Sequence, residues 1–316
     1  MSSSNLRGAI LSLIGMGIYA AHDVIIKLLG AGYPPHQVLF FASLMSTPMM
    51  TVLLLRDRFG GSLWPRHPGW VSARSACIVL AGVSNFYAFS VLPLAQVYVI
   101  LFTMPLLVTV LAIPILAERV GIHRWLAVLL GLSGVLIVLN PAAAPLSPGH
   151  FAAMIGAALG ATASVIIRRV GTSERAETLI LWPMIGNLVL TGVMLAFDYR
   201  PMELVDLALT GVIALFGLTA GFLIIMSYRA GEAAVVAPMQ YSQILWASLY
   251  GWLLFDERLD ARTVLGIAVI IASGVYILLR ESKSSLSHNR PASNARLRAE
   301  TVTAPKSTLL GRLWRR

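Results

Sequence analysis

The chain has 316 residues, of which 57% are hydrophobic and only 12% are charged. A soluble domain carries about twice that charged fraction, so the composition is typical of a protein with many membrane-spanning helices. The net charge of +10 does not indicate nucleic-acid binding, because the basic residues lie between the apolar segments and near the C-terminus. The single cysteine, Cys77, excludes an intrachain disulfide and a multi-cysteine metal site. We expect no metal and no cofactor.

A window of about 20 apolar residues predicts an all-α membrane protein with ten transmembrane helices. The predicted spans cover residues 8–29, 37–55, 71–92, 94–116, 125–140, 151–170, 178–197, 205–228, 233–255 and 264–279. The first apolar run is long enough to be a retained span rather than a cleaved signal peptide. From residue 282 onward the sequence is polar, and we expect residues 282–316 to form a disordered basic cytoplasmic tail.

The basic residues predict the orientation of these spans. With the N-terminus inside, 20 of the 24 Lys and Arg residues fall in cytoplasmic segments. The positive-inside rule therefore places both termini in the cytoplasm of a multi-pass protein, which we expect in a bacterial-type inner (plasma) membrane.

The two halves of the sequence resemble each other. "GMGIYAAHDVIIKLLG" (15–30) aligns with "GAALGATASVIIRRVG" (156–171), and "LAERV" (116–120) aligns with "FDERL" (255–259). The offsets of 141 and 139 residues are nearly constant, which favours an internal duplication into repeats at 1–140 and 141–281. Five spans per repeat are an odd number, so the second repeat is inverted in the membrane, as in alternating-access transporters.

Two longer segments resemble a known family. "YAFSVLPLAQVYVILFTMPLLVTVLAIPILAERV" (87–120) and "SYRAGEAAVVAPMQYSQILWASLYGWLLFDERLD" (227–260) are similar to the paired signatures of EamA-type transporters, in the drug/metabolite transporter superfamily. The resemblance implies a ten-helix bundle of two inverted five-helix repeats, in which helices one, three, four, six, eight and nine line a central cavity. It also implies transport of amino acids, nucleotide-like metabolites or vitamins, including S-adenosylmethionine and riboflavin.

Asp23 is the first candidate site residue, because a charge within a membrane span is costly and usually has a function. Tyr19 and Lys27 lie four residues to either side and share its helix face. Asp23 either forms a local pair with Lys27, or is a cavity carboxylate that carries a coupling proton or meets a cationic substrate group. His22 points about 100° away on the helix. A packed, hydrogen-bonded histidine is favoured there over a proton relay.

The ninth span offers a second set of candidates. Gln240 and Gln243 are three residues apart on one helix face, and Trp246 extends that face. These side chains either bind a planar polar ligand or form hydrogen bonds between helices. Tyr98 lies in the repeat-related helix, and Asn85 in the third span is a further candidate. The predicted substrate-binding residues are thus Tyr19, Asp23, Asn85, Tyr98, Gln240, Gln243 and Trp246, with Asp23 and His22 as proton-coupling candidates.

These observations predict a secondary transporter of a small metabolite, with riboflavin or S-adenosylmethionine as the expected substrate. An exporter of amino acids or drug-like metabolites is the alternative. A membrane-embedded enzyme would need a nucleophile–base pair or a metal cluster, and the sequence has no such constellation. We therefore expect no enzyme activity and no nucleic-acid partner. The expected partners are the substrate and the lipid bilayer, and a homodimer is left open.

Overall fold

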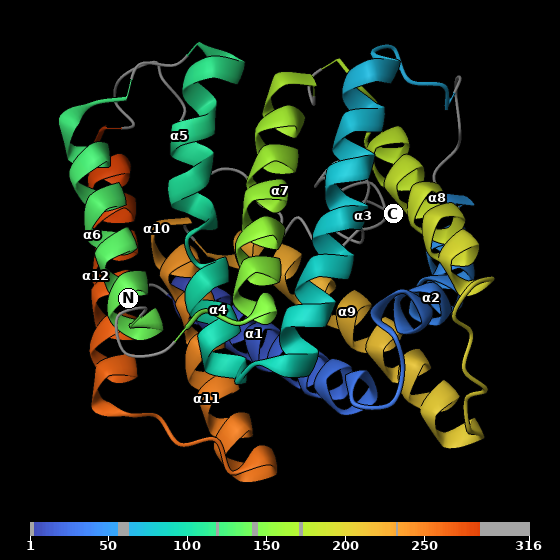
Figure 1. Ribbon diagram of the computed structural model, residues 1–316. Coiled ribbons are helices and arrows are strands. Elements are labelled where there is room, and N and C mark those ends of the chain that lie inside the picture. Colours follow the sequence, from blue (N-terminus) through green and yellow to red (C-terminus); the bar gives the residue numbers. More distant parts are fainter. Residues whose placement is uncertain are drawn as a thin grey trace.

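The computed structural model describes residues 3–55, 63–117, 120–140, 145–170, 173–231 and 233–284. Within these ranges every regular element is a helix (Figure 1). The helices are α1 (Ser3–Gly30), α2 (Pro35–Leu55), α3 (Pro68–Val91), α4 (Leu94–Leu101), α5 (Met104–Leu116), α6 (Ile122–Leu139), α7 (Pro148–Val170), α8 (Ala176–Leu195), α9 (Leu204–Ala230), α10 (Ala233–Val236), the 3-10 helix η1 (Ala237–Tyr241), α11 (Ser242–Phe255) and α12 (Ala261–Ser284). Most of the predicted C-terminal tail lies outside the described residues.

Within the part of the chain that the structure describes, six helical segments are long and apolar enough to cross a bilayer by length and composition. They are Asn5–Gly30, Pro68–Val91, Leu94–Leu116, Pro148–Val170, Thr178–Leu195 and Leu204–Ala230. Trp125–Leu139 and Ala261–Tyr276 are shorter apolar helices. The chain is therefore a multi-pass membrane protein by composition.

Two of the predicted spans are interrupted, which corrects the expectation of continuous helices there. The predicted span 94–116 divides into α4 and α5 around Phe102 and Thr103. Pro105 has no N–H to donate to the carbonyl of residue 101, which weakens the helix at this point. The predicted span 233–255 divides into α10, η1 and α11, and Pro238 lies in its 3-10 turn. Proline removes the regular hydrogen bond there as well.

The long helices pack in pairs that are far apart in sequence. The helix α1 runs along α9, α3 runs along α7, and α6 runs along α12 (Figure 1). Small residues allow the helices to approach closely. A Cβ on Gly8 of α1 would lie 2.8 Å from the Cα of Gly231, which directly follows α9. Each of these pairs combines a helix from residues 1–140 with one from residues 141–281.

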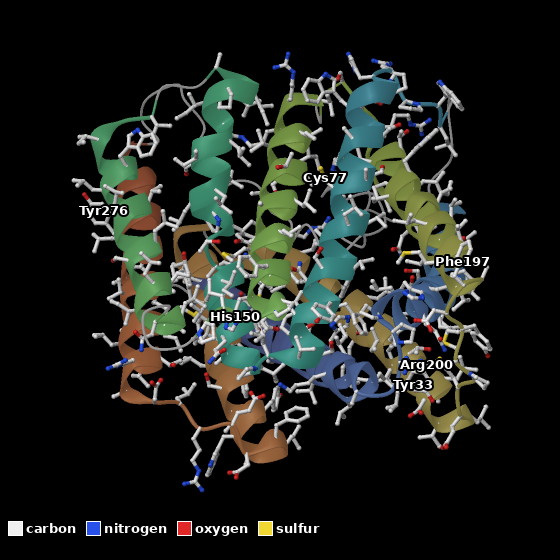
Figure 2. All side chains as sticks on the ribbon, viewed as in Figure 1. Tyr33, Cys77, His150, Phe197, Arg200 and Tyr276 are labelled. Carbon is white, nitrogen blue, oxygen red and sulfur yellow. The ribbon has the colours of Figure 1, made fainter. Side chains whose placement is uncertain are left out.

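Polar clamps join the two halves of the chain at opposite ends of the bundle. At one end the Tyr33 hydroxyl donates to Asp206 Oδ2 over 2.7 Å, and the Gln37 amide exchanges two hydrogen bonds with the backbone of Arg200. Figure 2 shows Tyr33 and Arg200 close together at this end. The hydrogen bond to Asp206 raises the pKa of Tyr33.

At the other end Glu174 accepts hydrogen bonds from the backbone N–H groups of His67 (2.6 Å) and Arg66 (3.1 Å), directly before α3. Burial by itself would raise the pKa of Glu174. The two backbone hydrogen bonds and the His67 ring outweigh it, so the pKa lies below its usual value. The carboxylate thus stays charged and satisfies N–H groups at the start of α3.

Candidate substrate site

Asp23 lies in α1 and is almost completely buried, with 1% of its surface exposed. His22 Nδ1 lies 2.7 Å from Asp23 Oδ1, and the hydroxyl of Tyr98 in α4 donates to Asp23 Oδ2. A buried carboxylate is tolerated only where such groups replace its hydration. The expected separation of His22 from Asp23 on the helix wheel is therefore wrong at the level of the side chains, because the flexible imidazole reaches its neighbour.

Tyr98 connects Asp23 to a third helix. Gln243 of α11 donates from Nε2 to the Tyr98 hydroxyl over 3.0 Å. Both side chains are buried, and the hydroxyl accepts from Gln243 while donating to Asp23. The rings of Phe89 and Phe102 lie 5.4 and 6.4 Å from the Tyr98 ring. The structure therefore brings together four of the predicted residues, His22, Asp23, Tyr98 and Gln243, as one connected polar cluster among aromatic rings.

Other predicted residues form a second group. The Trp246 indole donates to the Leu13 carbonyl of α1 over 3.1 Å and packs, with Tyr19, in a cluster between α1 and α9. Gln240 donates instead to the Tyr228 hydroxyl of α9 over 2.8 Å. Gln240 and Gln243, which the sequence predicts on one helix face, therefore have different partners: Gln240 bonds to Tyr228 of α9 and Gln243 bonds to Tyr98 of α4.

Asn85 belongs to neither group. It lies in α3 with 3% of its surface exposed, and its amide faces Gly156 of α7. A Cβ on Gly156 would lie 1.7 Å from Asn85 Oδ1. This close fit places Asn85 in the contact between α3 and α7.

Lys27 and Glu257 form an ion pair that the sequence did not predict. The Lys27 ammonium bonds to Glu257 Oε1 and to the Leu92 carbonyl, and lies 5.1 Å from the ring centroid of Phe255. Glu257 Oε2 accepts from the backbone N–H of Leu94 over 2.9 Å. Glu257 caps α4, a helix far away in sequence, and its side chain is only 16% exposed.

One sequence signal pointed to this cap. Pro93, at the N-cap of α4, has no side-chain group that could accept from the first amides of the helix. An acceptor from elsewhere was therefore required, but its position 163 residues away could not be inferred. Among the described residues, no group of three or more His, Cys, Asp or Glu side chains could hold a metal ion.

Comparison with known protein families identifies the family of this chain. The model of the EamA-like transporter family matches residues 6–140 and again residues 147–280. The chain belongs to this family, and it is a transporter of the drug/metabolite type.

Several named relatives share most of the chain. An S-adenosylmethionine uptake transporter of Rickettsia bellii is 24% identical over 86% of this chain and 93% of its own length. A riboflavin transporter of Rhizobium johnstonii is 27% identical over 77% and 79%. A pseudopaline exporter of Pseudomonas aeruginosa is 23% identical over 85% and 95%.

A solved crystal structure has a similar fold. It is 16% identical to this chain, covers 90% of it and 99% of its own length, and superposes with a TM-score of 0.58. This similarity supports the fold alone.

Proposed function

We propose that the chain moves a small cationic metabolite by alternating access between two inverted five-helix repeats, residues 1–140 and 141–281. In this proposal the ten predicted spans all cross the membrane, including those formed by α2, α6, α12 and the segment α10–η1–α11. The substrate meets the Asp23 cluster where the two repeats face each other.

Features that recur at the spacing of the predicted repeat support this architecture. Ala117 and Asp256 are 139 residues apart, and each directly follows the end of a helix. Both residues have a left-handed backbone conformation, with φ of 54° and 53°. Phe102 and Tyr241 have the same spacing, and their rings stack with centroids 5.0 Å apart. Equivalent residues of two repeats touch each other only near the axis that relates them. The stacked pair supports an inverted repeat whose axis passes close to Phe102 and Tyr241.

The distribution of basic residues supports an orientation with both termini in the cytoplasm of a bacterial inner membrane. The relatives named above are all bacterial proteins.

The Asp23 cluster is the observation that carries the proposed substrate class. A buried carboxylate beside aromatic rings stabilises an organic cation, through charge and through the ring faces. S-adenosylmethionine carries a sulfonium and an ammonium group, and the Rickettsia bellii relative is named for its uptake. Riboflavin is neutral and offers Asp23 no counter-charge. We therefore place the cationic group at Asp23, with Tyr98 and Gln243 as polar contacts. The group of Tyr19, Gln240 and Trp246 receives the rest of the molecule.

Asp23 is also the proposed coupling residue. A proton and a substrate cation compete for the same carboxylate, and His22 is the hydrogen-bonded neighbour that can exchange a proton with it. Asp23→Asn keeps the size of the side chain but cannot take up a proton. We expect this variant to lose pH-dependent transport while it remains folded.

The proposal is tested by ligand-induced thermal stabilisation and by uptake into proteoliposomes. At about 100 times its dissociation constant, S-adenosylmethionine should stabilise the protein by about 2.7 kcal/mol. S-adenosylhomocysteine, which lacks the sulfonium charge, should stabilise it less, and Asp23→Asn should remove the difference. Asp256→Asn is the matched control, because the Asp256 side chain is 83% exposed.

Stabilisation by riboflavin that persists in Asp23→Asn would overturn the cationic substrate and favour a neutral planar one. Stabilisation by amino acids alone would favour the amino-acid exporter.

A further inference from the structure

The helix α4 differs from the long helices by its length and its boundaries. It has eight residues, begins directly after Pro93, and ends where Phe102 and Thr103 interrupt the helix before α5. Seven of its residues are buried. In Figure 1 it lies in front of α1 and next to α11. A short helix between two interruptions can open locally, independently of the long helices, because both of its ends lack the continuous hydrogen-bond ladder of a helix.

We propose that α4 is a gate of the transporter and that Glu257 is the positioning residue that latches it closed. One carboxylate performs two tasks. Its Oε2 accepts from the Leu94 N–H at the positive end of the α4 dipole, and its Oε1 pairs with Lys27 of α1. Lys27 also donates to the Leu92 carbonyl over 2.6 Å. The turn that begins α4 is thus held on both sides by this one ion pair.

The second attachment of α4 lies one helical turn further along. Tyr98 of α4 bonds to Asp23 of α1 and accepts from Gln243 of α11. Both attachments therefore use the same two partners, α1 and the region of α11. If a substrate cation or a proton takes Asp23 from Tyr98, the Glu257 latch still holds the start of α4 against the bundle. The Glu257 contacts then determine the free energy that α4 needs to open in the substrate-loaded transporter. This last step rests on the function proposed above, whereas the latch itself does not.

The side chains around the latch favour a strong but breakable contact. Lys27 and Glu257 are 15% and 16% exposed, so they are shielded from water without being fully desolvated. Hydrogen bonds to charged groups contribute about 1.5–3 kcal/mol each. Because about 1.4 kcal/mol is a factor of ten in an equilibrium constant, losing one such contact should raise the open population of α4 by about 10- to 100-fold.

The experiment is hydrogen–deuterium exchange, read by mass spectrometry on the purified full chain in detergent without substrate. We compare the wild type with Glu257→Gln and Lys27→Met. In both variants the amides of residues 94–101 should exchange about 10- to 100-fold faster. Residues 104–116 of α5 serve as the internal reference and should be unchanged. Asp256→Asn should match the wild type, since Asp256 is the adjacent exposed carboxylate and pairs with Arg258.

Unchanged exchange in residues 94–101 of Glu257→Gln would overturn the latch. A uniform increase over α4 and α5 would also overturn it, because that pattern reports a general loss of stability. Transport by Glu257→Gln in proteoliposomes adds a second readout. We expect a changed Vmax with KM altered less than in Asp23→Asn, because Glu257 does not contact the proposed substrate. If exchange rises locally but Asp23→Asn transports normally, the latch stands and the proposed binding site fails.

Discussion

The contact between Gly156 and Asn85 allows a stability prediction to be worked out from the structure. Gly156→Ala would place a Cβ 1.7 Å from Oδ1, 2.5 Å from Cγ and 3.0 Å from Nδ2 of Asn85. Real Cβ contacts essentially never fall below 3.0 Å, so the amide must leave its position. It is 3% exposed and cannot turn into solvent. Overpacking a buried contact costs about 1–3 kcal/mol.

Alanine also has a better helix propensity than glycine, which returns about 1 kcal/mol. We therefore expect Gly156→Ala to lower the free energy of unfolding by up to about 2 kcal/mol. The assay is denaturant-induced unfolding in mixed micelles. Gly186→Ala in α8 is the matched control, because its new Cβ would find its nearest neighbours at 3.8 and 3.9 Å, an ordinary contact. It should be neutral or slightly stabilising.

A double-mutant cycle with Asn85→Ala makes the reasoning refutable. The three nearest atoms to the new Cβ all belong to the Asn85 amide. In the Asn85→Ala background the clash is absent, so Gly156→Ala should be neutral or stabilising by up to about 1 kcal/mol. The coupling energy should then equal the full cost of the clash, about 1–3 kcal/mol. If Gly156→Ala is equally destabilising in both backgrounds, the clash with Asn85 is not the cause and the argument is refuted.

Three further predictions follow from single contacts. Tyr98→Phe removes the hydrogen bonds to Asp23 and Gln243, and should lower stability by about 1–3 kcal/mol and shift the pH profile of transport; an unchanged profile would separate Tyr98 from the coupling group. Glu174 has a lowered pKa in the folded state, so its contribution is present above the usual pKa of about 4.5 and is lost as the pH falls through the lowered value; Glu174→Gln should flatten this acid loss in pH-dependent melting curves. Trp246→Phe deletes one hydrogen bond to a backbone carbonyl and should cost about 0.5–1.5 kcal/mol in denaturant unfolding, and a loss above about 3 kcal/mol would contradict this assignment.

The positions of the helices followed largely from the sequence. A long apolar segment in a bilayer must form its backbone hydrogen bonds within itself, which a helix does. The length of the apolar runs therefore predicted the helices at residues 8–29 and 151–170. The breaks in spans 94–116 and 233–255 were missed. A proline within a transmembrane helix is often tolerated, so Pro105 and Pro238 alone do not distinguish a kink from a break.

The sequence also identified the chemistry of the candidate site, because a carboxylate within an apolar span needs a partner wherever the chain folds. Asp23 was therefore a candidate from the sequence alone, as was Tyr98 through its position in the predicted repeat. The partners of these side chains could not be inferred in the same way. Lys27 was a possible partner of Asp23, and it bonds instead to Glu257, 230 residues away. Sequence periodicity shows which residues share a helix face, but not which distant helix lies against that face. Packing of α11 against both α1 and α4 decides that, because it brings Asp23, Tyr98 and Gln243 within hydrogen-bond distance.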